Sequence, residues 1–143
     1  MASVKSVRIE GLEELAKNIE RTAASIGPAK AKSIYADGAA LIRDRAKQLA
    51  PFDPTRRKGT HLRDAIYMYT RNPRESFVLV GVRHSPRGAP HAHLMEFGYA
   101  TRGGGFFAGR PYFRPAIAEM SDQAGKVIID GLSKAIEAAA EQR

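Results

Sequence analysis

The first half of the chain spaces its apolar residues as an α-helix does. Residues 11–26 and residues 28–49 each carry apolar positions that recur every three or four residues, which predicts two amphipathic helices. Gly27 and Pro28 separate the two helices, because glycine interrupts a helix and proline suits the first turn of the next one. The first apolar stripe consists of Leu12, Leu15, Ile19, Ala23 and Ile26.

The central part of the chain changes to the pattern of β-strands. Residues 64–70 and 76–82 are apolar runs joined by residues 71–75, which contain an Asn-Pro pair. This arrangement predicts an antiparallel β-hairpin. Both runs are apolar on both faces, so we expect the hairpin to lie inside a larger sheet or at an interface. A further short strand is expected at residues 3–10.

The last part of the chain returns to helical spacing. Pro115 opens a predicted helix that extends to about Ala140. Segments rich in glycine, proline and charge at about residues 51–62, 83–90 and 99–110 are expected to be exposed loops. The predicted buried stripe of the last helix comprises Ile117, Met120, Ala124, Val127, Ile128, Gly131, Leu132, Ala135 and Ile136.

The order of these elements predicts the fold class. A strand, two helices, further strands and a final helix favour an α+β fold. We expect an antiparallel sheet with a β-hairpin, packed by two N-terminal helices and one long C-terminal helix. A chain of 143 residues is long enough for one domain with a real core and too short for two, so residues 1–143 are expected to form a single domain.

The positive charge of the chain is concentrated in its middle. Residues 56–114 carry 11 basic side chains, ten of them arginine, against 3 acidic ones, which is a net charge of +8. Residues 115–143 carry 5 acidic and 3 basic side chains. Arginine forms forked bonds to carboxylates and to phosphates, so the middle region suits a neighbouring subunit or a nucleic acid. No helix loaded with arginine is present, which favours contact between subunits.

Several classes of protein are excluded by what the sequence lacks. The absence of cysteine excludes disulfides, cysteine-based zinc sites and thiol nucleophiles. The sequence also contains no Gly-x-Ser-x-Gly elbow of a serine hydrolase. The longest apolar run, residues 77–82, is too short to span a membrane, and the N-terminus has no apolar signal core. We therefore expect a soluble, unexported protein.

Two histidines and a glutamate are candidates for a metal site. His91, His93 and Glu96 offer ligands for a metal-dependent hydrolase. On a strand, His91 and His93 would share one face and Glu96 would point to the other. On a helix, His93 and Glu96 would be neighbours but His91 would not. Neither geometry therefore brings all three side chains together. The favoured alternative is a strand or turn with solvent-exposed histidines, an arginine partner for Glu96, and the packed side chains of Leu94, Met95 and Phe97.

The glycine-rich segment at residues 99–110 carries two adjacent phenylalanines. A Walker phosphate loop needs Gly-Lys followed by serine or threonine, and this sequence is missing here. Phe106 and Phe107 are unfavourable in water, so we interpret the segment as a hairpin or loop tip that docks on a partner.

Residues 110–115 connect this segment to the last helix. The two prolines of the sequence Arg-Pro-Tyr-Phe-Arg-Pro stiffen the backbone. We expect Tyr112 and Phe113 to anchor the segment to the sheet, and Arg110 and Arg114 to extend outward. The segment is either a rigid connector or part of a direct interface, and the sequence does not decide between these two roles.

The motifs, taken in order, resemble a known family. The most specific pair is His-x-x-Glu-Phe-Gly at residues 93–98 and Arg-Pro-Tyr-Phe-Arg-Pro-Ala at residues 110–116. The segments "GLEELAKNIE", "AKQLAP" and "HLRDAI" precede this pair. The ordered set is similar to the phage head–tail joining and tail-completion (neck) proteins that include lambda minor tail protein Z. The loop "APFDPTRRKGTHLR" is longer and more basic than the compact turn of that family.

The resemblance implies a structural virion protein with no enzymatic activity and no cofactor. The implied partners are other copies of the chain in a ring, as a hexamer or dodecamer, head-side connector and tail-tube proteins, and phage double-stranded DNA in the lumen, with no membrane. The implied location is the virion, and the host cytoplasm during assembly. A basic DNA-binding accessory protein and the metal-dependent hydrolase remain as alternatives. The interface candidates are Arg83, Arg87, Glu96, Arg102, Phe106, Phe107, Arg110, Tyr112 and Arg114.

Overall fold

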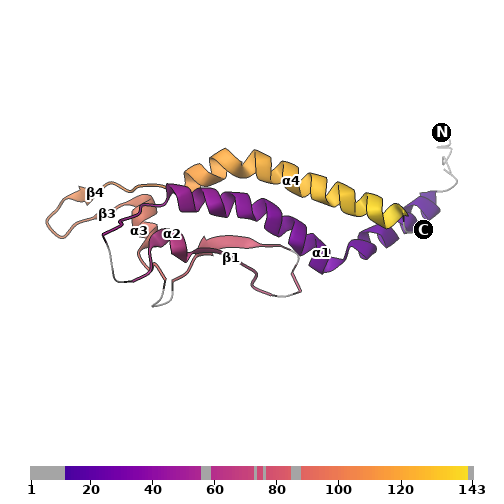
Figure 1. Ribbon diagram of the computed structural model, residues 1–143, viewed down its shortest axis with the longest axis horizontal. Coiled ribbons are helices and arrows are strands. Elements are labelled where there is room, and N and C mark those ends of the chain that lie inside the picture. Colours follow the sequence, from indigo (N-terminus) through magenta and orange to yellow (C-terminus); the bar gives the residue numbers. More distant parts are fainter. Residues whose placement is uncertain (1–11, 56–58, 73, 76, 85–87, 142–143) are drawn as a thin grey trace, which may run out of the picture.

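The computed structural model describes residues 12–55, 59–72, 74–75, 77–84 and 88–141. In this part of the chain the molecule is elongated, and helix α1 lies between helix α4 on one side and the hairpin of β1 and β2 on the other (Figure 1). Helices combined with antiparallel hairpins confirm the predicted α+β class. The predicted strand at residues 3–10 and the candidate Arg87 lie outside the described residues.

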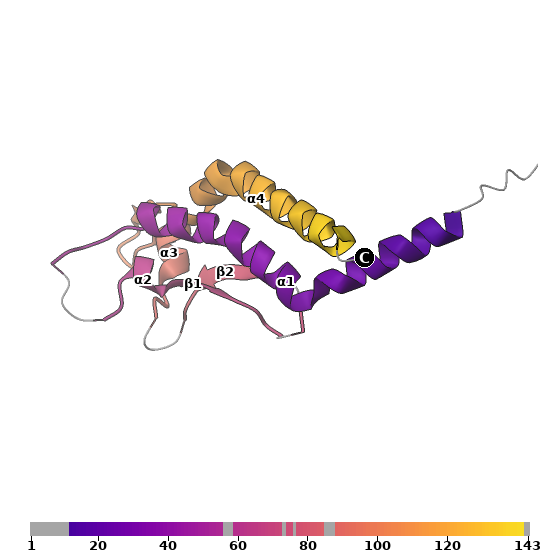
Figure 2. The ribbon, with the colours of Figure 1, turned by 45° about the vertical axis from the view of Figure 1, so that its right-hand side comes forward.

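Helix α1 extends over Leu12–Leu49 and bends at Gly27. The two helices predicted here form one run with a kink, because Gly27 adopts φ 62° and ψ 157°, a conformation that only glycine enters without strain. Pro28 follows and lacks the N–H that would continue the helical hydrogen bonds. The segment before the kink projects past the C-terminal end of α4 (Figure 2). Most of the apolar side chains predicted on that segment lie outside those that the structure describes.

Helix α4, Phe113–Glu141, packs along α1 through two glycines. A Cβ atom at Gly38 would lie 2.6 Å from Cγ1 of Ile128, and a Cβ atom at Gly131 would lie 2.7 Å from Cγ2 of Ile34. Each isoleucine therefore occupies the space that a glycine leaves on the opposite helix, and the two backbones approach closely.

The buried stripe predicted for α4 is only partly correct. Ala124 is buried as predicted, but Ile117 and Ile136 are 44% and 47% exposed; Ile129, which the predicted stripe does not include, is 63% exposed. The reason is that α4 packs mainly on α1, which covers one face, whereas the apolar residues spread over a wider arc. No helix in the described part of the chain combines the length and apolarity that a membrane span requires.

Strands β1, Ile66–Tyr69, and β2, Leu79–Val82, form an antiparallel hairpin against α1, with Ile66 opposite Val82. Strand β1 is shorter than the predicted run, because residues Leu62–Ala65 form the short helix α2. The described residues give this sheet two strands, so the larger sheet expected around the hairpin is not formed among them.

A small core ties these elements to the start of α4. Ile66 of β1 is 1% exposed, and Tyr112, directly before α4, is 2% exposed. The start of the last helix is therefore anchored in the interior, as expected for Tyr112. The core cluster consists of Ala46, Ala50, Ile66, Tyr112 and Ala116.

Helix α3, Ala92–Phe97, corrects the sequence interpretation of this stretch. A strand or turn that buries Phe97 was expected, and this is wrong on both counts. Helical spacing places Ala92 and Glu96 on one buried face, at 4% and 5% exposure, and turns Phe97 toward solvent. The charged residue of the motif is thus the buried one.

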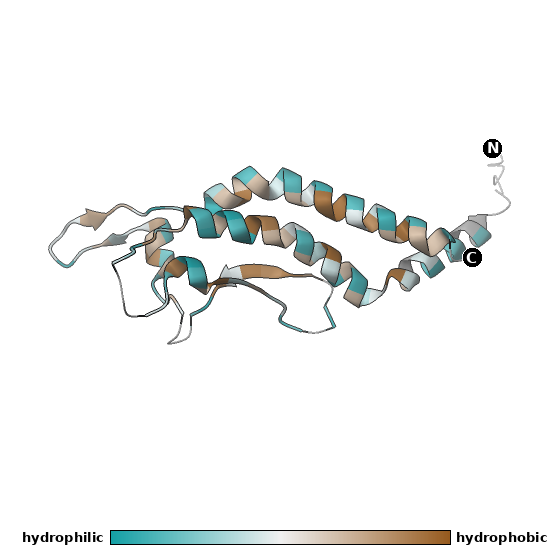
Figure 3. Ribbon diagram, viewed as in Figure 1, coloured by the Kyte–Doolittle hydropathy of each residue, from teal (hydrophilic) through white to brown (hydrophobic). Residues whose placement is uncertain are grey.

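Strands β3, Tyr99–Ala100, and β4, Phe106–Phe107, form a second antiparallel hairpin. The hairpin lies at the end of the molecule opposite the C-terminal end of α4 (Figure 1). Its turn contains Gly104 with φ 83°, which favours glycine. Strand β4 is an apolar segment in otherwise polar surroundings (Figure 3). The glycine-rich segment is therefore an ordered hairpin that presents phenylalanines.

Candidate assembly interface

The Glu96 carboxylate closes the N-terminus of α4. Its Oε2 accepts hydrogen bonds from the backbone N–H groups of Tyr112 at 2.8 Å and Phe113 at 2.9 Å, and its Oε1 accepts one from the N–H of Arg114 at 3.1 Å. The first N–H groups of a helix have no partner inside the helix and carry partial positive charge, so a carboxylate is a favourable cap. A side chain of α3 therefore determines where α4 begins.

Arg114 adds a second connection between α3 and α4. Its Nε lies 3.1 Å from Oε1 of Glu96, and its Nη2 donates to the Glu96 carbonyl oxygen at 3.4 Å. The guanidinium carbon lies 5.0 Å from the centre of the Phe97 ring. The expectation that Glu96 pairs with a nearby arginine is confirmed, and Arg114 is that partner.

Burial and hydrogen bonding act in opposite directions on the pKa of Glu96. Burial alone raises this pKa, but the N–H groups of Phe113, Tyr112 and Arg114 and the Arg114 guanidinium bring it below its ordinary value. Burial, followed by the negative charge of Glu96, raises the pKa of Tyr112 to about 12. At neutral pH the cap is therefore ionised beside a neutral phenol.

Two glycines bring the end of α3 against the base of the β3–β4 hairpin. Gly98 has φ 81°, and a Cβ atom at Gly109 would lie 2.6 Å from the backbone nitrogen of Gly98. The N–H of Arg110 donates to the carbonyl of Met95 at 2.7 Å. Helix α3, the hairpin and the start of α4 are thus held together. These contacts connect the two sequence motifs that flank the hairpin, residues 93–98 and residues 110–116.

Aromatic rings form the outer side of this unit. Phe97 and Phe106 are 64% and 69% exposed, and Tyr99 is 40% exposed. Tyr99 stacks on Phe107 across the hairpin, with ring centres 5.2 Å apart. Exposed large rings on a small hairpin are typical of a surface that a partner covers.

Positive charge accompanies these rings. Residues 99–113 contain Arg102 and Arg110, both exposed, and no carboxylate. The segment therefore has a net charge of +2 beside its aromatic rings. We call this region the hairpin surface and define it by Phe97, Tyr99, Arg102, Phe106 and Arg110.

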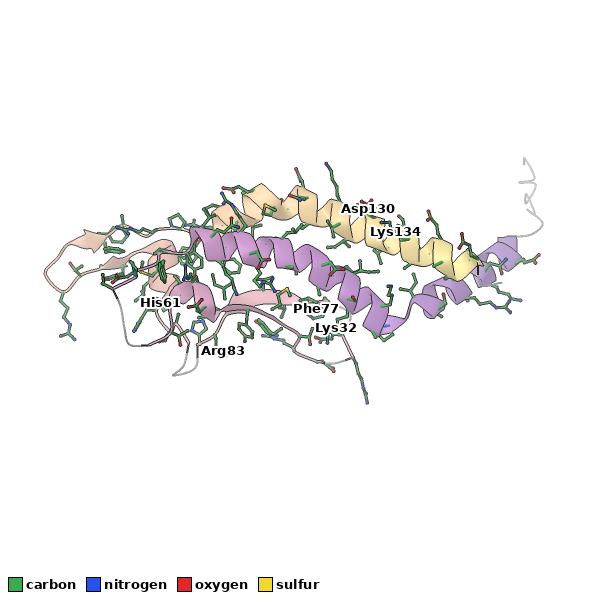
Figure 4. The ribbon with its side chains drawn as sticks, in the orientation of Figure 1. Lys32, His61, Phe77, Arg83, Asp130 and Lys134 are labelled. Atoms are coloured by element: carbon green, nitrogen blue, oxygen red, sulfur yellow. The ribbon has the colours of Figure 1, made fainter. Side chains whose placement is uncertain are left out.

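Two of the other candidates predicted from the sequence border the hairpin surface, since Phe107 stacks on Tyr99 and Arg114 lies over the Phe97 ring, whereas Arg83, Glu96 and Tyr112 do not form part of it. Arg83 follows β2 on the side of the molecule opposite α4, with its guanidinium carbon 5.0 Å from the centre of the Tyr67 ring (Figure 4). Glu96 and Tyr112 are buried inside the protomer. The backbone-capping role of Glu96 was missed by the sequence analysis, because the N–H groups that donate to its carboxylate lie 16 or more residues away along the chain.

The histidines near Glu96 do not gather around its carboxylate. Helix α3 places His93 three positions before Glu96, so the two are neighbours on the helix, but it leaves His91 outside the helix at the N-cap. Both carboxylate oxygens of Glu96 already accept backbone N–H groups. Among the residues that the structure describes, no group of three histidine, aspartate or glutamate side chains is placed to hold a metal ion.

The comparison with protein families gives one match. A family model described as "Bacteriophage HK97-gp10, putative tail-component" matches residues 13–98, more than half of the chain. The match includes α1, both strands of the first hairpin and α3, and it ends at Gly98, before the second hairpin. No curated protein and no solved structure gives a significant match. The chain therefore belongs to the HK97-gp10-like family of bacteriophage tail components.

Proposed function

We propose that the protein assembles with copies of itself into a ring at the neck of the phage particle, where it completes the tail and joins it to the head. The ring, a hexamer or dodecamer, contacts head-side connector and tail-tube proteins and surrounds the phage DNA. Its role is structural, without catalysis or cofactor. The observation that carries the proposal is the hairpin surface, which exposes aromatic rings in a chain from a tail-component family.

The exposed rings supply a driving force for assembly. Complete burial of a phenylalanine side chain stabilises a contact by roughly 1.5–3 kcal/mol relative to leaving it in water. Phe97 and Phe106 both have most of their surface available for such burial. A contact that covers both gains several kcal/mol, and a closed ring repeats this gain at every joint.

The arginines of the hairpin surface support protein contact in preference to DNA binding. A ring around DNA must let the DNA slide, and tight phosphate binding by every arginine would oppose this movement. Arg45 and Arg114 already pair with the carboxylates of Glu119 and Glu96 inside the protomer. We infer that Arg102 and Arg110 pair with carboxylates of a neighbouring copy.

A basic DNA-binding accessory protein is the second candidate. The net charge of +8 over residues 56–114 favours it. This function requires an affinity for duplex DNA that falls steeply as salt concentration rises. A binding titration at increasing salt, with purified protein and a duplex of random sequence, separates the two functions, because the ring proposal requires no tight binding to free DNA.

The proposal is tested by electron microscopy of phage that lack the protein. The expected particles are DNA-filled heads and separate tails, and resupplied wild-type protein should restore attachment. Resupplied Phe106→Asp protein should fail, because an aspartate at this exposed position removes apolar area from the hairpin surface. The exposed α4 variant Lys134→Ala is the matched control and should restore attachment. Normal attached tails on phage without the protein would contradict the proposal.

A further inference from the structure

Helix α4 has a second apolar face besides the one that packs on α1. Gly125, Ile129, Leu132 and Ile136 follow one another at intervals of four, three and four residues, which aligns them along one side of the helix. Ile129 and Ile136 are 63% and 47% exposed, so their own protomer leaves them largely uncovered. We call these four positions the outer face of α4.

The charge around the outer face is complementary to the hairpin surface. Residues 120–141 contain four carboxylates and two lysines, which is a net charge of −2. Two of these charged residues, Asp130 and Lys134, are visible on α4 in Figure 4. The hairpin segment at residues 99–113 has a net charge of +2 and no carboxylate. The α4 segment and the hairpin segment therefore both expose apolar side chains, and their net charges have opposite signs.

The two surfaces cannot meet within one protomer. At a rise of 1.5 Å per residue, Ile129 and Ile136 lie about 24 Å and about 34 Å along the axis from the start of α4. The β3–β4 hairpin extends from that same start toward the opposite end of the molecule (Figure 1). Contact between the surfaces therefore requires two copies of the chain.

We propose that the hairpin surface of one copy docks on the outer face of α4 of the next copy. The inference rests on the proposed ring, since this contact would be its repeated joint. Phe97 and Phe106 cover Ile129 and Ile136, while the hairpin arginines face the α4 carboxylates. Each copy presents one surface of each kind, which is the requirement for a heterologous head-to-tail contact that closes into a ring.

Two variants that each block one surface test this pairing. Phe106→Asp blocks the hairpin surface, and Ile129→Asp blocks the outer face; both positions are exposed, so unaltered circular dichroism and melting temperature are expected. In sedimentation experiments each variant alone should stay monomeric. Their equimolar mixture should form a heterodimer and nothing larger, because only one intact surface of each kind remains.

Lys134→Ala is the matched control on α4. Lys134 lies about 140° around the helix from Ile129, so this variant should sediment as the wild type does. The inference is overturned by a folded Ile129→Asp protein that assembles normally, or by a mixture without heterodimer. A symmetrical hairpin-to-hairpin contact would give the latter result, together with dimers of Ile129→Asp alone.

Assembled particles provide a second measurement that does not depend on assembly in solution. The natural chain has no cysteine, so Phe106→Cys and Ile129→Cys in one chain carry the only thiols. A short bifunctional thiol reagent should give a ladder of cross-linked copies, whereas Phe106→Cys with Lys134→Cys should not. Monomer alone from the first pair overturns the inference.

The failure of this inference and the failure of the ring proposal have different signatures in phage. Normal necks with Ile129→Asp but not with Phe106→Asp would exclude the outer face as the docking site and leave the ring function standing. Normal necks in the complete absence of the protein would remove both.

Discussion

The carboxylate of Glu96 accepts a hydrogen bond from the backbone N–H of Phe113 at 2.9 Å, and this contact joins the end of α3 to the first turn of α4. The β3–β4 hairpin lies between these two residues in sequence. Its orientation is therefore set by a buried carboxylate that the hairpin itself does not contain. Loss of this cap should affect both the stability of the fold and the placement of the hairpin surface.

Replacement of Glu96 by alanine should lower the free energy of unfolding by roughly 1–3 kcal/mol, because buried N–H groups at the start of α4 lose their acceptor. Urea denaturation followed by circular dichroism measures this loss. Glu119→Ala is the control, since its pair with Arg45 lies at the surface and should contribute about 0–1 kcal/mol. Equal losses for the two variants would contradict the capping role.

The depressed pKa of Glu96 predicts a dependence of stability on pH. The unfolded carboxyl titrates near pH 4.3, above the folded value, so the cap contributes fully at higher pH and its contribution is lost as pH falls through the folded pKa. The difference in unfolding free energy between wild type and Glu96→Gln should therefore shrink below about pH 4. A difference that stays constant from neutral to acidic pH would show that the charge plays no part.

The pKa of Tyr112, about 12, predicts that its phenol ionises at a higher pH than an ordinary tyrosine does. Because the unfolded phenol ionises near pH 10, the folded state should lose stability as pH rises from about 10 toward 12. An absorbance titration of the folded protein should contain a component near pH 12, and Tyr112→Phe should remove it. Survival of that component in Tyr112→Phe would assign it to another residue.

Two glycine substitutions should have effects of opposite sign. Gly38→Ala places a Cβ atom 2.6 Å from Ile128 and should destabilise the fold by about 1–3 kcal/mol through overpacking. Gly125→Ala meets nothing within 4 Å and should stabilise α4 by up to about 1 kcal/mol, because alanine favours the helix. Thermal unfolding of both variants measures the contrast. A neutral Gly38→Ala would mean that the helices do not pack this closely.

Arginine substitutions should separate stability from assembly. Arg114→Glu places a second carboxylate beside Glu96 and should lower the melting temperature. Arg102→Glu, at an exposed position of the hairpin, should leave the melting temperature unchanged and weaken assembly. Differential scanning calorimetry and sedimentation measure the two properties. The sequence alone predicts an outward Arg114, and its pairing with Glu96 makes Arg102 the better test of the interface.

The buried carboxylate and the exposed ring of α3 show where sequence patterns fail. Apolar character predicts burial of Phe97 and charge predicts exposure of Glu96, and the structure reverses both. A pattern cannot indicate this, because the acceptor that α4 needs is defined by N–H groups 16 or more residues away. The same holds for Ile117 and Ile136, which the helical period predicts to be buried and whose exposure depends on α4 packing mainly on one helix.

Local rules were sufficient for the helical periods, the kink at Gly27 and the strands of the first hairpin, because propensity, glycine conformation and alternation act between near neighbours. The order of the motifs along the sequence was sufficient to indicate the family. Contacts between distant segments required the folded chain: Gly38 against Ile128, Glu96 against the start of α4, and the placement of the hairpin surface and the outer face of α4 at opposite ends. These relationships depend on the length of each element and on which of its faces packs against a neighbouring element. Both are defined only when the elements pack together.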